Sequence, residues 1–143
     1  MQEWFATPPG RYLLAWEQAQ FDQAVADVFG YHALQLGAAQ VEGLRANRMP
    51  HRWLALDDPA HLAHAPQAVL LTDFAALPFA ANSLDLVVLP HALELSPDPH
   101  ATLREVERVL VPEGRVVICG LNPTSLWGMR QRRAHLYLSL IHI

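Results

Sequence analysis

The sequence predicts an α/β fold built on a mainly parallel sheet, with helices on both faces. Short apolar segments alternate along the chain with segments of helical periodicity, which is the pattern of such folds. Leu84–Leu89 is a nearly continuous apolar run, as expected of a parallel strand that is covered on both faces. Asp98 and Pro99 then supply a helix start, with an aspartate cap and a proline in the first helical position.

Length and composition favour one globular domain. The chain has 143 residues, of which 52% are hydrophobic and 17% charged, enough apolar material for a core. Ten basic and fourteen acidic residues give a net charge of -4, which argues against a nucleic-acid partner. No segment approaches the roughly 20 apolar residues of a membrane span, so we expect no span and a cytoplasmic location.

The N-terminal segment, residues 1–30, is predicted to be helical. Arg11–Phe29 places Leu14, Phe21, Val25 and Val28 on one face, and we expect the polar residues, Glu17 among them, to lie elsewhere. Gly30 is expected to end this helix.

Five further elements are predicted before residue 73. They are a strand at Tyr31–Gly37, a modest helix at Ala38–Asn47, a strand at Trp53–Leu56, a weak helix or loop at Pro59–His64 and a strand at Ala68–Thr72.

The second half of the chain continues the alternation. A fourth strand is predicted at Ser83–Leu89, with Asp85 holding neighbouring backbone, and a helix follows from Asp98. A turn at Pro112–Gly114 leads into a fifth strand, Arg115–Cys119. Cys119 is interpreted as a buried strand cysteine, with a catalytic thiol as the alternative. No pair of histidines has a familiar metal-ligand spacing, so no metal site is predicted.

The residues that follow the strands are the candidate site, because ligands of open parallel sheets bind beyond the carboxyl ends of the strands. These residues are Gly37, Asp57 with Asp58, Asp73, His91 and Asn122. No phosphate-binding loop and no dinucleotide glycine fingerprint is present, which disfavours a nicotinamide-dependent oxidoreductase. Acids at the strand ends suit a positively charged ligand with hydroxyl and amino groups.

Several short motifs then resemble one family in their order and spacing. The motifs are Asp73-Phe-Ala-Ala-Leu-Pro-Phe79, Asn82-Ser-Leu-Asp-Leu-Val-Val88, His91-Ala-Leu-Glu-Leu95, Pro97-Asp-Pro99, Leu103-Arg-Glu-Val-Glu-Arg-Val-Leu110, Pro112-Glu-Gly114 and Arg115-Val-Val-Ile118. They resemble class I S-adenosylmethionine-dependent methyltransferases of the type 11, ubiquinone-biosynthesis-like kind. The resemblance implies a Rossmann-like core at residues 31–122, S-adenosylmethionine as cofactor and a small-molecule methyl acceptor.

The resemblance also implies roles for matching residues. Asp73 would accept a hydrogen bond from the adenine amino group, with Leu77 beside the ring; the alternative is a strand-end acid that makes a turn. Asp57 or Asp58 would bind the ribose hydroxyls, unless it caps a helix before Pro59. His91 would act as general base on the acceptor, the alternative being a histidine packed under the site or simply exposed.

The first loop departs from the family pattern. The family has an acid and several glycines there, whereas this chain has Gln35-Leu-Gly-Ala-Ala-Gln40, with only Gly37 retained. Gln35 would still hydrogen-bond the amino-acid end of the cofactor, but it brings no charge. The alternative function is therefore a non-catalytic, methyltransferase-like binding or regulatory domain.

The resemblance implies two more strands than the chain is expected to hold. After a short basic piece, Arg130–Arg133, the last residues, Leu136–Ile143, are too few for the helix and the final antiparallel pair of the family fold. We therefore expect an irregular or truncated tail at residues 123–143, with a helix packed on the sheet as the alternative.

Overall fold

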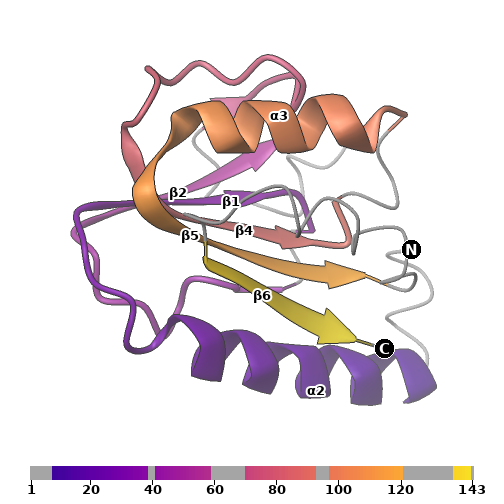
Figure 1. Cartoon of the computed structure of the whole chain (residues 1–143). Helices are drawn as coiled ribbons and strands as arrows, with labels where there is room; N and C mark the ends of the chain where they lie inside the picture. Colours follow the sequence, from indigo (N-terminus) through magenta and orange to yellow (C-terminus); the bar gives the residue numbers. More distant parts are fainter. Residues whose placement is uncertain (1–7, 39–40, 59–69, 93–96, 121–136, 143) are drawn as a thin grey trace.

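A six-stranded sheet lies between two helices in the computed structural model (Figure 1), which describes residues 8–38, 41–58, 70–92, 97–120 and 137–142. The elements are α2 (Pro8–Val25), β1 (His32–Leu36), β2 (His51–Leu56), β3 (Leu70–Leu71), β4 (Leu84–Pro90), α3 (Pro99–Val109), β5 (Leu110–Gly120) and β6 (Tyr137–His142). The strand order is β3-β2-β1-β4-β5-β6, and all five neighbouring pairs are parallel. The predicted α/β fold, with helices on both faces of a parallel sheet, is confirmed.

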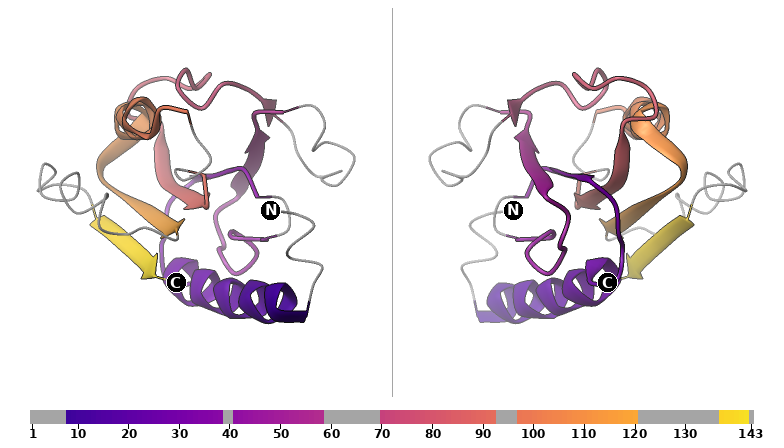
Figure 2. Two further views of the ribbon diagram at one scale, coloured as in Figure 1. Left: turned by 90° about the vertical axis from the view of Figure 1, so that its right-hand side faces the viewer. Right: turned by 90° about the vertical axis from the view of Figure 1, so that its left-hand side faces the viewer.

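Alternation along the strands divides the core into two layers. In β4, Val87 and Leu89 belong to the cluster under α3, whereas Leu86 and Val88 belong to the cluster under α2. Figure 2 shows the two helices on opposite sides of the sheet when it is viewed from its ends. Both faces of β4 are therefore buried, which is why its sequence is apolar almost without interruption.

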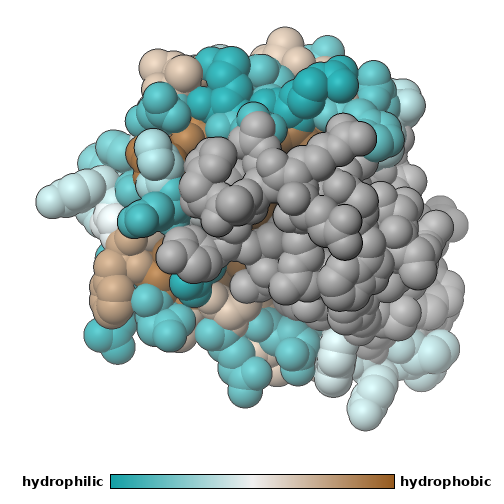
Figure 3. Space-filling model, in the orientation of Figure 1, coloured by the Kyte–Doolittle hydropathy of each residue, from teal (hydrophilic) through white to brown (hydrophobic). Residues whose placement is uncertain are grey.

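Helix α3 follows its sequence signals closely. The Asp98 carboxylate accepts a hydrogen bond from the Ala101 amide at 3.1 Å, and Pro99 occupies the first turn, so the predicted cap is confirmed. Thr102, Val106 and Val109 are buried against the sheet. The upper part of the molecule, where α3 lies, presents a largely hydrophilic outer surface in Figure 3.

Helix α2 ends at Val25, four residues before the end that the sequence predicts at Phe29. The Asn47 side-chain amide donates to the carbonyl oxygens of Val25 and Val28 at 2.9 and 3.0 Å. A side chain distant in sequence therefore satisfies carbonyls at the end of the helix, the role expected of Gly30.

The helix predicted at Ala38–Asn47 is wrong for the described residues 41–47, which form turns. The side-chain amide of Gln18 exchanges two hydrogen bonds of 2.8 Å with the backbone of Glu42, and Arg45 forms a 2.6 Å ion pair with Asp22. These contacts with α2 take the place of helical hydrogen bonds, and Gly43 within the segment is a poor helix former.

Strand β5 begins earlier than predicted and contains the expected turn as an irregularity. Leu84 pairs with Leu110, but the next pair along the ladder is Leu86 with Arg115. The residues between, Val111–Gly114, which include the predicted turn at Pro112–Gly114, bulge out of the ladder, and Glu113 has a φ of 68°.

Strand β6 lies within residues 123–143, the segment expected to be irregular or truncated; the rest of that segment is outside the described residues. Strand β6 pairs in parallel with β5 from Tyr137 to His142. The predicted element at Pro59–His64 lies outside the described residues, and of the predicted third strand only Leu70–Leu71 is described as strand. Neither described helix has the length and apolar character needed to cross a membrane.

Asp85 braces the amino-terminal edge of the sheet. Its Oδ2 accepts hydrogen bonds from the backbone amides of Tyr31 and His32 at 2.9 and 3.1 Å. The predicted structural role of Asp85 is therefore confirmed. A Cβ on Gly30 would lie 2.5 Å from Asp85 Cγ, so the chain approaches this side chain too closely for any other residue.

We predict that Gly30→Ala destabilises the protein by about 1–3 kcal/mol, because the added methyl group overlaps Asp85. The free energy of unfolding, measured by chemical denaturation, checks this. The same substitution in an Asp85→Gly background should cost less, because the three overlapping side-chain atoms of Asp85, its Cβ among them, are gone. An equal cost in both backgrounds would contradict the proposed overlap.

Candidate functional site

Three of the predicted site residues follow the carboxyl ends of β1, β2 and β3. Gly37 directly follows β1, and its amide donates to the carbonyl oxygen of Ala55 in β2 at 2.8 Å. Asp57 directly follows β2, and Asp73 lies two residues after β3. Because the three strands are parallel neighbours in register, the structure brings Gly37, Asp57 and Asp73 to the same rim.

The carboxylates of this rim are open to solvent. Asp57, Asp58 and Asp73 are all exposed. The Asp73 Oδ1 accepts the amide of Ala75 at 2.9 Å, a local turn that leaves its second oxygen available to a ligand. The rim can therefore accept hydrogen bonds from hydroxyl or amino groups.

Gly37 stands where the backbone bends away from β1. Its φ of 76° lies in the left-handed region, which favours glycine. A Cβ built on Gly37 would meet the ring of Phe74 at 3.6 Å, so the loops after β1 and β3 lie against each other at this rim.

Gln35 lies beneath the rim and holds the loop that follows β1. Its Nε2 donates to the carbonyl oxygens of Gly37, Ala38 and Val41 at 2.9, 3.2 and 2.8 Å. Its Oε1 accepts the amide of Gly43 at 2.9 Å. Both ends of this buried amide are thus engaged with backbone, and the side chain acts as a clamp on the loop.

Leu77 is buried in the core cluster under α3, and two side chains of α3 hold its backbone. Glu105 Oε1 accepts the Leu77 amide at 2.8 Å, and Arg108 donates to the Leu77 carbonyl oxygen at 3.0 Å. Hydrogen bonds from Arg108 hold the pKa of Glu105 below its usual value. This pair fixes the segment after Asp73 to the body of the domain.

His91 follows β4 but points into the interior instead of lying open on the rim. It is only 1% exposed, its φ is 59°, and its amide donates to the carbonyl oxygen of Cys119 at 2.8 Å. A left-handed conformation is uncommon for residues other than glycine, and here it ends the strand. The structure therefore separates His91 from the exposed acids and places it against other side chains.

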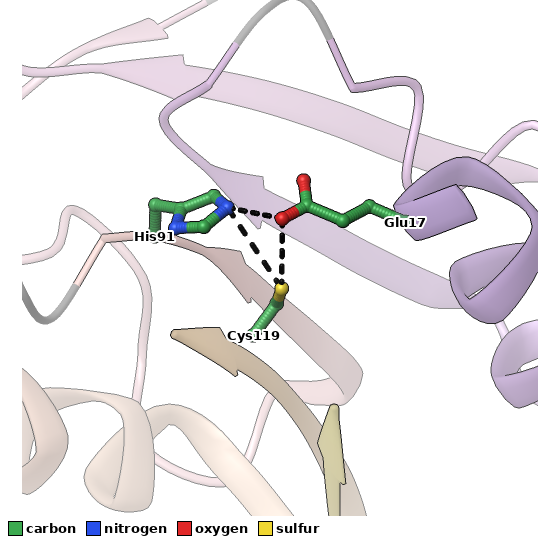
Figure 4. Close-up of side chains that lie close together, drawn as sticks. All are labelled: Glu17, His91 and Cys119. Carbon is green, nitrogen blue, oxygen red and sulfur yellow. Dashed lines mark hydrogen bonds and ion pairs between the residues drawn. The ribbon is translucent and has the colours of Figure 1, made fainter. Parts of the chain in front are cut away.

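Those side chains are Glu17 of α2 and Cys119 of β5 (Figure 4). His91 Nε2 lies 2.6 Å from Glu17 Oε1, and Cys119 Sγ lies 3.5 Å from the same oxygen and 3.9 Å from the histidine nitrogen. All three residues are at most 1% exposed. We call Glu17, His91 and Cys119 the buried polar cluster.

The prediction that Glu17 lies off the apolar face of its helix is wrong. Glu17 comes three residues after Leu14 and four before Phe21, so helical periodicity puts it on the same face. The structure buries it completely. An acid at an apolar position of an amphipathic helix was the sequence feature that could have predicted a buried polar site. The interpretation of Cys119 as a buried strand cysteine is confirmed.

Comparisons with known proteins identify the kind of domain to which the chain is similar. Residues 34–118 match a family described as methyltransferase domain. The uncharacterized protein YafS of Escherichia coli is 31% identical over 140 residues, covering 90% of this chain and 51% of that protein. A malonyl-[acyl-carrier protein] O-methyltransferase of Gallionella capsiferriformans is 42% identical over 65 residues, covering 46% of this chain and 22% of the enzyme.

A solved structure shares the fold. It is a putative methyltransferase in complex with the Haloferax volcanii Trm112 methyltransferase activator, with a TM-score of 0.58 and 27% identity. The match covers 69% of this chain and 49% of that one. This chain thus spans about half the length of the Escherichia coli relative, and less of the Gallionella enzyme.

We predict that Gln35→Glu, which introduces the acid that the family pattern has at the start of this loop, destabilises the protein by about 1–3 kcal/mol. A carboxylate cannot donate to the three carbonyl oxygens that Gln35 Nε2 contacts. Thermal and chemical denaturation measure the loss. The exposed Gln23→Glu is the matched control and should change stability little. Equal stability of Gln35→Glu and the parent chain would contradict the clamp.

We predict that Glu105→Gln lowers stability by up to about 1 kcal/mol near pH 7 and by less near pH 3. The Glu105 pKa is lowered in the folded state, so its contribution is present above the unfolded value and is lost as the pH falls through the folded value. Chemical denaturation of both proteins across this range checks it. The exposed Glu113→Gln serves as control, and a Glu105→Gln difference that does not change with pH would argue against the ion pair.

Proposed function

Because this chain belongs to the methyltransferase domain family, which matches residues 34–118, we propose that it binds S-adenosylmethionine at the carboxyl rim and transfers the methyl group to a small-molecule acceptor. The observation that carries the proposal is the gathering of Gly37, Asp57 and Asp73 at the ends of adjacent parallel strands. S-adenosylmethionine carries ribose hydroxyls, an ammonium group and a sulfonium centre but no phosphate, which suits a rim of exposed carboxylates.

In this proposal different carboxylates of the rim bind the ribose and the adenine of the cofactor. The Asp57 or Asp58 carboxylate accepts hydrogen bonds from the two ribose hydroxyls, since one carboxylate has two acceptor oxygens. Asp73 accepts from the adenine amino group. Leu77 lies below the surface, and its backbone, held by Glu105 and Arg108, fixes the loop against which the adenine ring would rest.

Gly37 and Gln35 shape the part of the site that would receive the amino-acid end. The left-handed bend at Gly37 leaves no Cβ between the backbone and a ligand. Gln35 is proposed to contribute through the loop that it clamps, because its amide is already engaged with backbone.

Methyl transfer itself requires little from side chains. The sulfonium is an activated methyl donor, so alignment of nucleophile, methyl group and sulfur supplies most of the acceleration, about 7–11 kcal/mol in well-oriented systems. His91 as a general base is a separate proposal: its ring is buried against Glu17, so the acceptor would have to reach it from the rim. The methyl transfer proposal does not depend on that role.

A second candidate function is a non-catalytic binding or regulatory domain of the same fold. The specific observation in its favour is the loop after β1, in which Gln35 replaces an acid and the following positions are Ala38, Ala39 and Gln40 where the family has glycines. Because the Gln35 side chain is a neutral amide, this loop offers no negative charge to the ammonium group of the cofactor.

We predict that the chain binds S-adenosylhomocysteine in isothermal titration calorimetry and that Asp73→Ala weakens binding about 10–100-fold. The estimate corresponds to the loss of one hydrogen bond to a charged group. Asp27→Ala removes another exposed acid, which precedes β1 at the opposite edge of the sheet, and should leave the affinity unchanged.

The possible outcomes separate the two functions. Binding that is weakened in Asp73→Ala and unchanged in Asp27→Ala supports a cofactor site at the rim. Binding that Asp73→Ala leaves untouched contradicts the role of Asp73. Absence of binding at millimolar ligand contradicts the methyltransferase proposal and favours the non-catalytic domain.

A further inference from the structure

We propose that the buried polar cluster, Glu17, His91 and Cys119, is a binding site for a divalent transition metal ion of the zinc type. The three side chains each offer one donor atom, and these atoms all lie within 4.8 Å of one another. They come from three different elements, α2, the end of β4 and β5, and converge at one point (Figure 4). The inference does not depend on cofactor binding at the rim.

The donor set selects the metal. Thiolate, imidazole and carboxylate are the three ligand types of protein zinc sites, whereas calcium and magnesium prefer oxygen ligands alone. Three protein ligands also leave one position of a tetrahedral ion open, as in catalytic zinc sites.

The distances are close to those that a tetrahedral ion requires. Zinc bonds of about 2.0–2.3 Å imply ligand atoms about 3.3–3.8 Å apart. Cys119 Sγ lies 3.5 Å from Glu17 Oε1 and 3.9 Å from His91 Nε2. The 2.6 Å contact between Glu17 Oε1 and His91 Nε2 is a hydrogen bond, and it would lengthen by a fraction of an ångström when the ion displaces its proton.

A second observation also favours a cation at this position. Glu17 Oε2 is inaccessible to solvent and has no hydrogen-bond partner within the described part of the chain. A buried carboxylate oxygen without compensation is costly in an apolar interior. Hydrogen bonding with His91 explains the first oxygen of Glu17 but not the second. A metal ion bound by the Glu17 carboxylate would balance the negative charge that its two oxygens share.

A metal at this position would connect α2 to the sheet. Around the cluster, α2 contacts the sheet through apolar side chains, including Phe21 and Val25, which share a core cluster with Cys119. Coordination would add a cross-link between a helix and two strands. Because an ion that binds only the folded state stabilises it by mass action, metal binding should be visible as increased thermal stability.

Cobalt(II) is the probe that tests the site, because it replaces zinc and reports its ligands by absorption. Metal-free, untagged chain is titrated with Co²⁺ in the absence of any cofactor. We expect one equivalent to produce a thiolate-to-cobalt charge-transfer band and the intense visible bands of a tetrahedral ion, and one equivalent of Zn²⁺ to abolish both. We also expect Zn²⁺ at a hundredfold excess over Kd to raise Tm by at least about 4 °C.

Variants assign the ligands. Cys119→Ser should abolish the charge-transfer band, and Glu17→Gln and His91→Ala should each weaken zinc binding by more than about tenfold, since loss of an outer partner alone costs 10–100-fold. His100→Ala, which removes an exposed histidine at the start of α3, is the control and should bind as the parent chain does. Circular dichroism confirms that each variant is folded.

Results on the parent chain decide the proposal even if a variant fails to fold. Absence of a charge-transfer band, or a Tm that zinc does not raise, would overturn it. So would a band that persists in folded Cys119→Ser, or an affinity that His100→Ala reduces as much as His91→Ala does. Loss of cofactor binding at the rim with these metal signals intact would refute the proposed function and leave the metal site standing.

Discussion

Parallel pairing of β4 with β1 on one side and β5 on the other is the constraint on which the rest of the structure depends. Parallel strands require crossovers, and the crossovers place helices on both faces of the sheet. Both faces of β4 are therefore covered, one by α3 and the other by α2. The same pairing aligns the carboxyl ends of the strands, so that residues far apart in the sequence, such as Gly37 and Asp73, reach one rim.

Polar side chains anchor the segments between the strands by long-range hydrogen bonds to backbone. Asn47 binds the carbonyls at the end of α2, Gln35 binds four backbone groups of the loop after β1, and Asp85 binds the amides at the start of β1. Each brace satisfies backbone groups that regular structure leaves unpaired. Of the three, Gln35 holds a loop of the candidate site, whereas Asn47 and Asp85 fix the chain at the end of α2 and at the start of β1.

The buried polar cluster sets a different requirement on the fold. Glu17 occupies a position on the apolar face of α2. Its burial there depends on hydrogen bonds with His91 and Cys119 at the ends of β4 and β5. Removing one partner of a buried hydrogen bond costs about 1–3 kcal/mol in other proteins, because a buried polar group is left unsatisfied. The docking of α2 and the position of His91 are therefore coupled, and the cluster links the helix to the edge of the sheet beside the candidate site.

The sequence by itself determined the class of fold and most of its elements, because periodicity, caps and breakers are local. The apolar run of β4 and the Asp98 cap of α3 are examples, and the acids after the strands marked the rim. Only the tertiary structure decided that residues 41–47 form turns, that α2 ends at Val25 and that Glu17 meets His91 and Cys119. In each of these cases the deciding contact joins residues far apart in the chain, and no local pattern records which distant side chain will satisfy a backbone group or a buried charge.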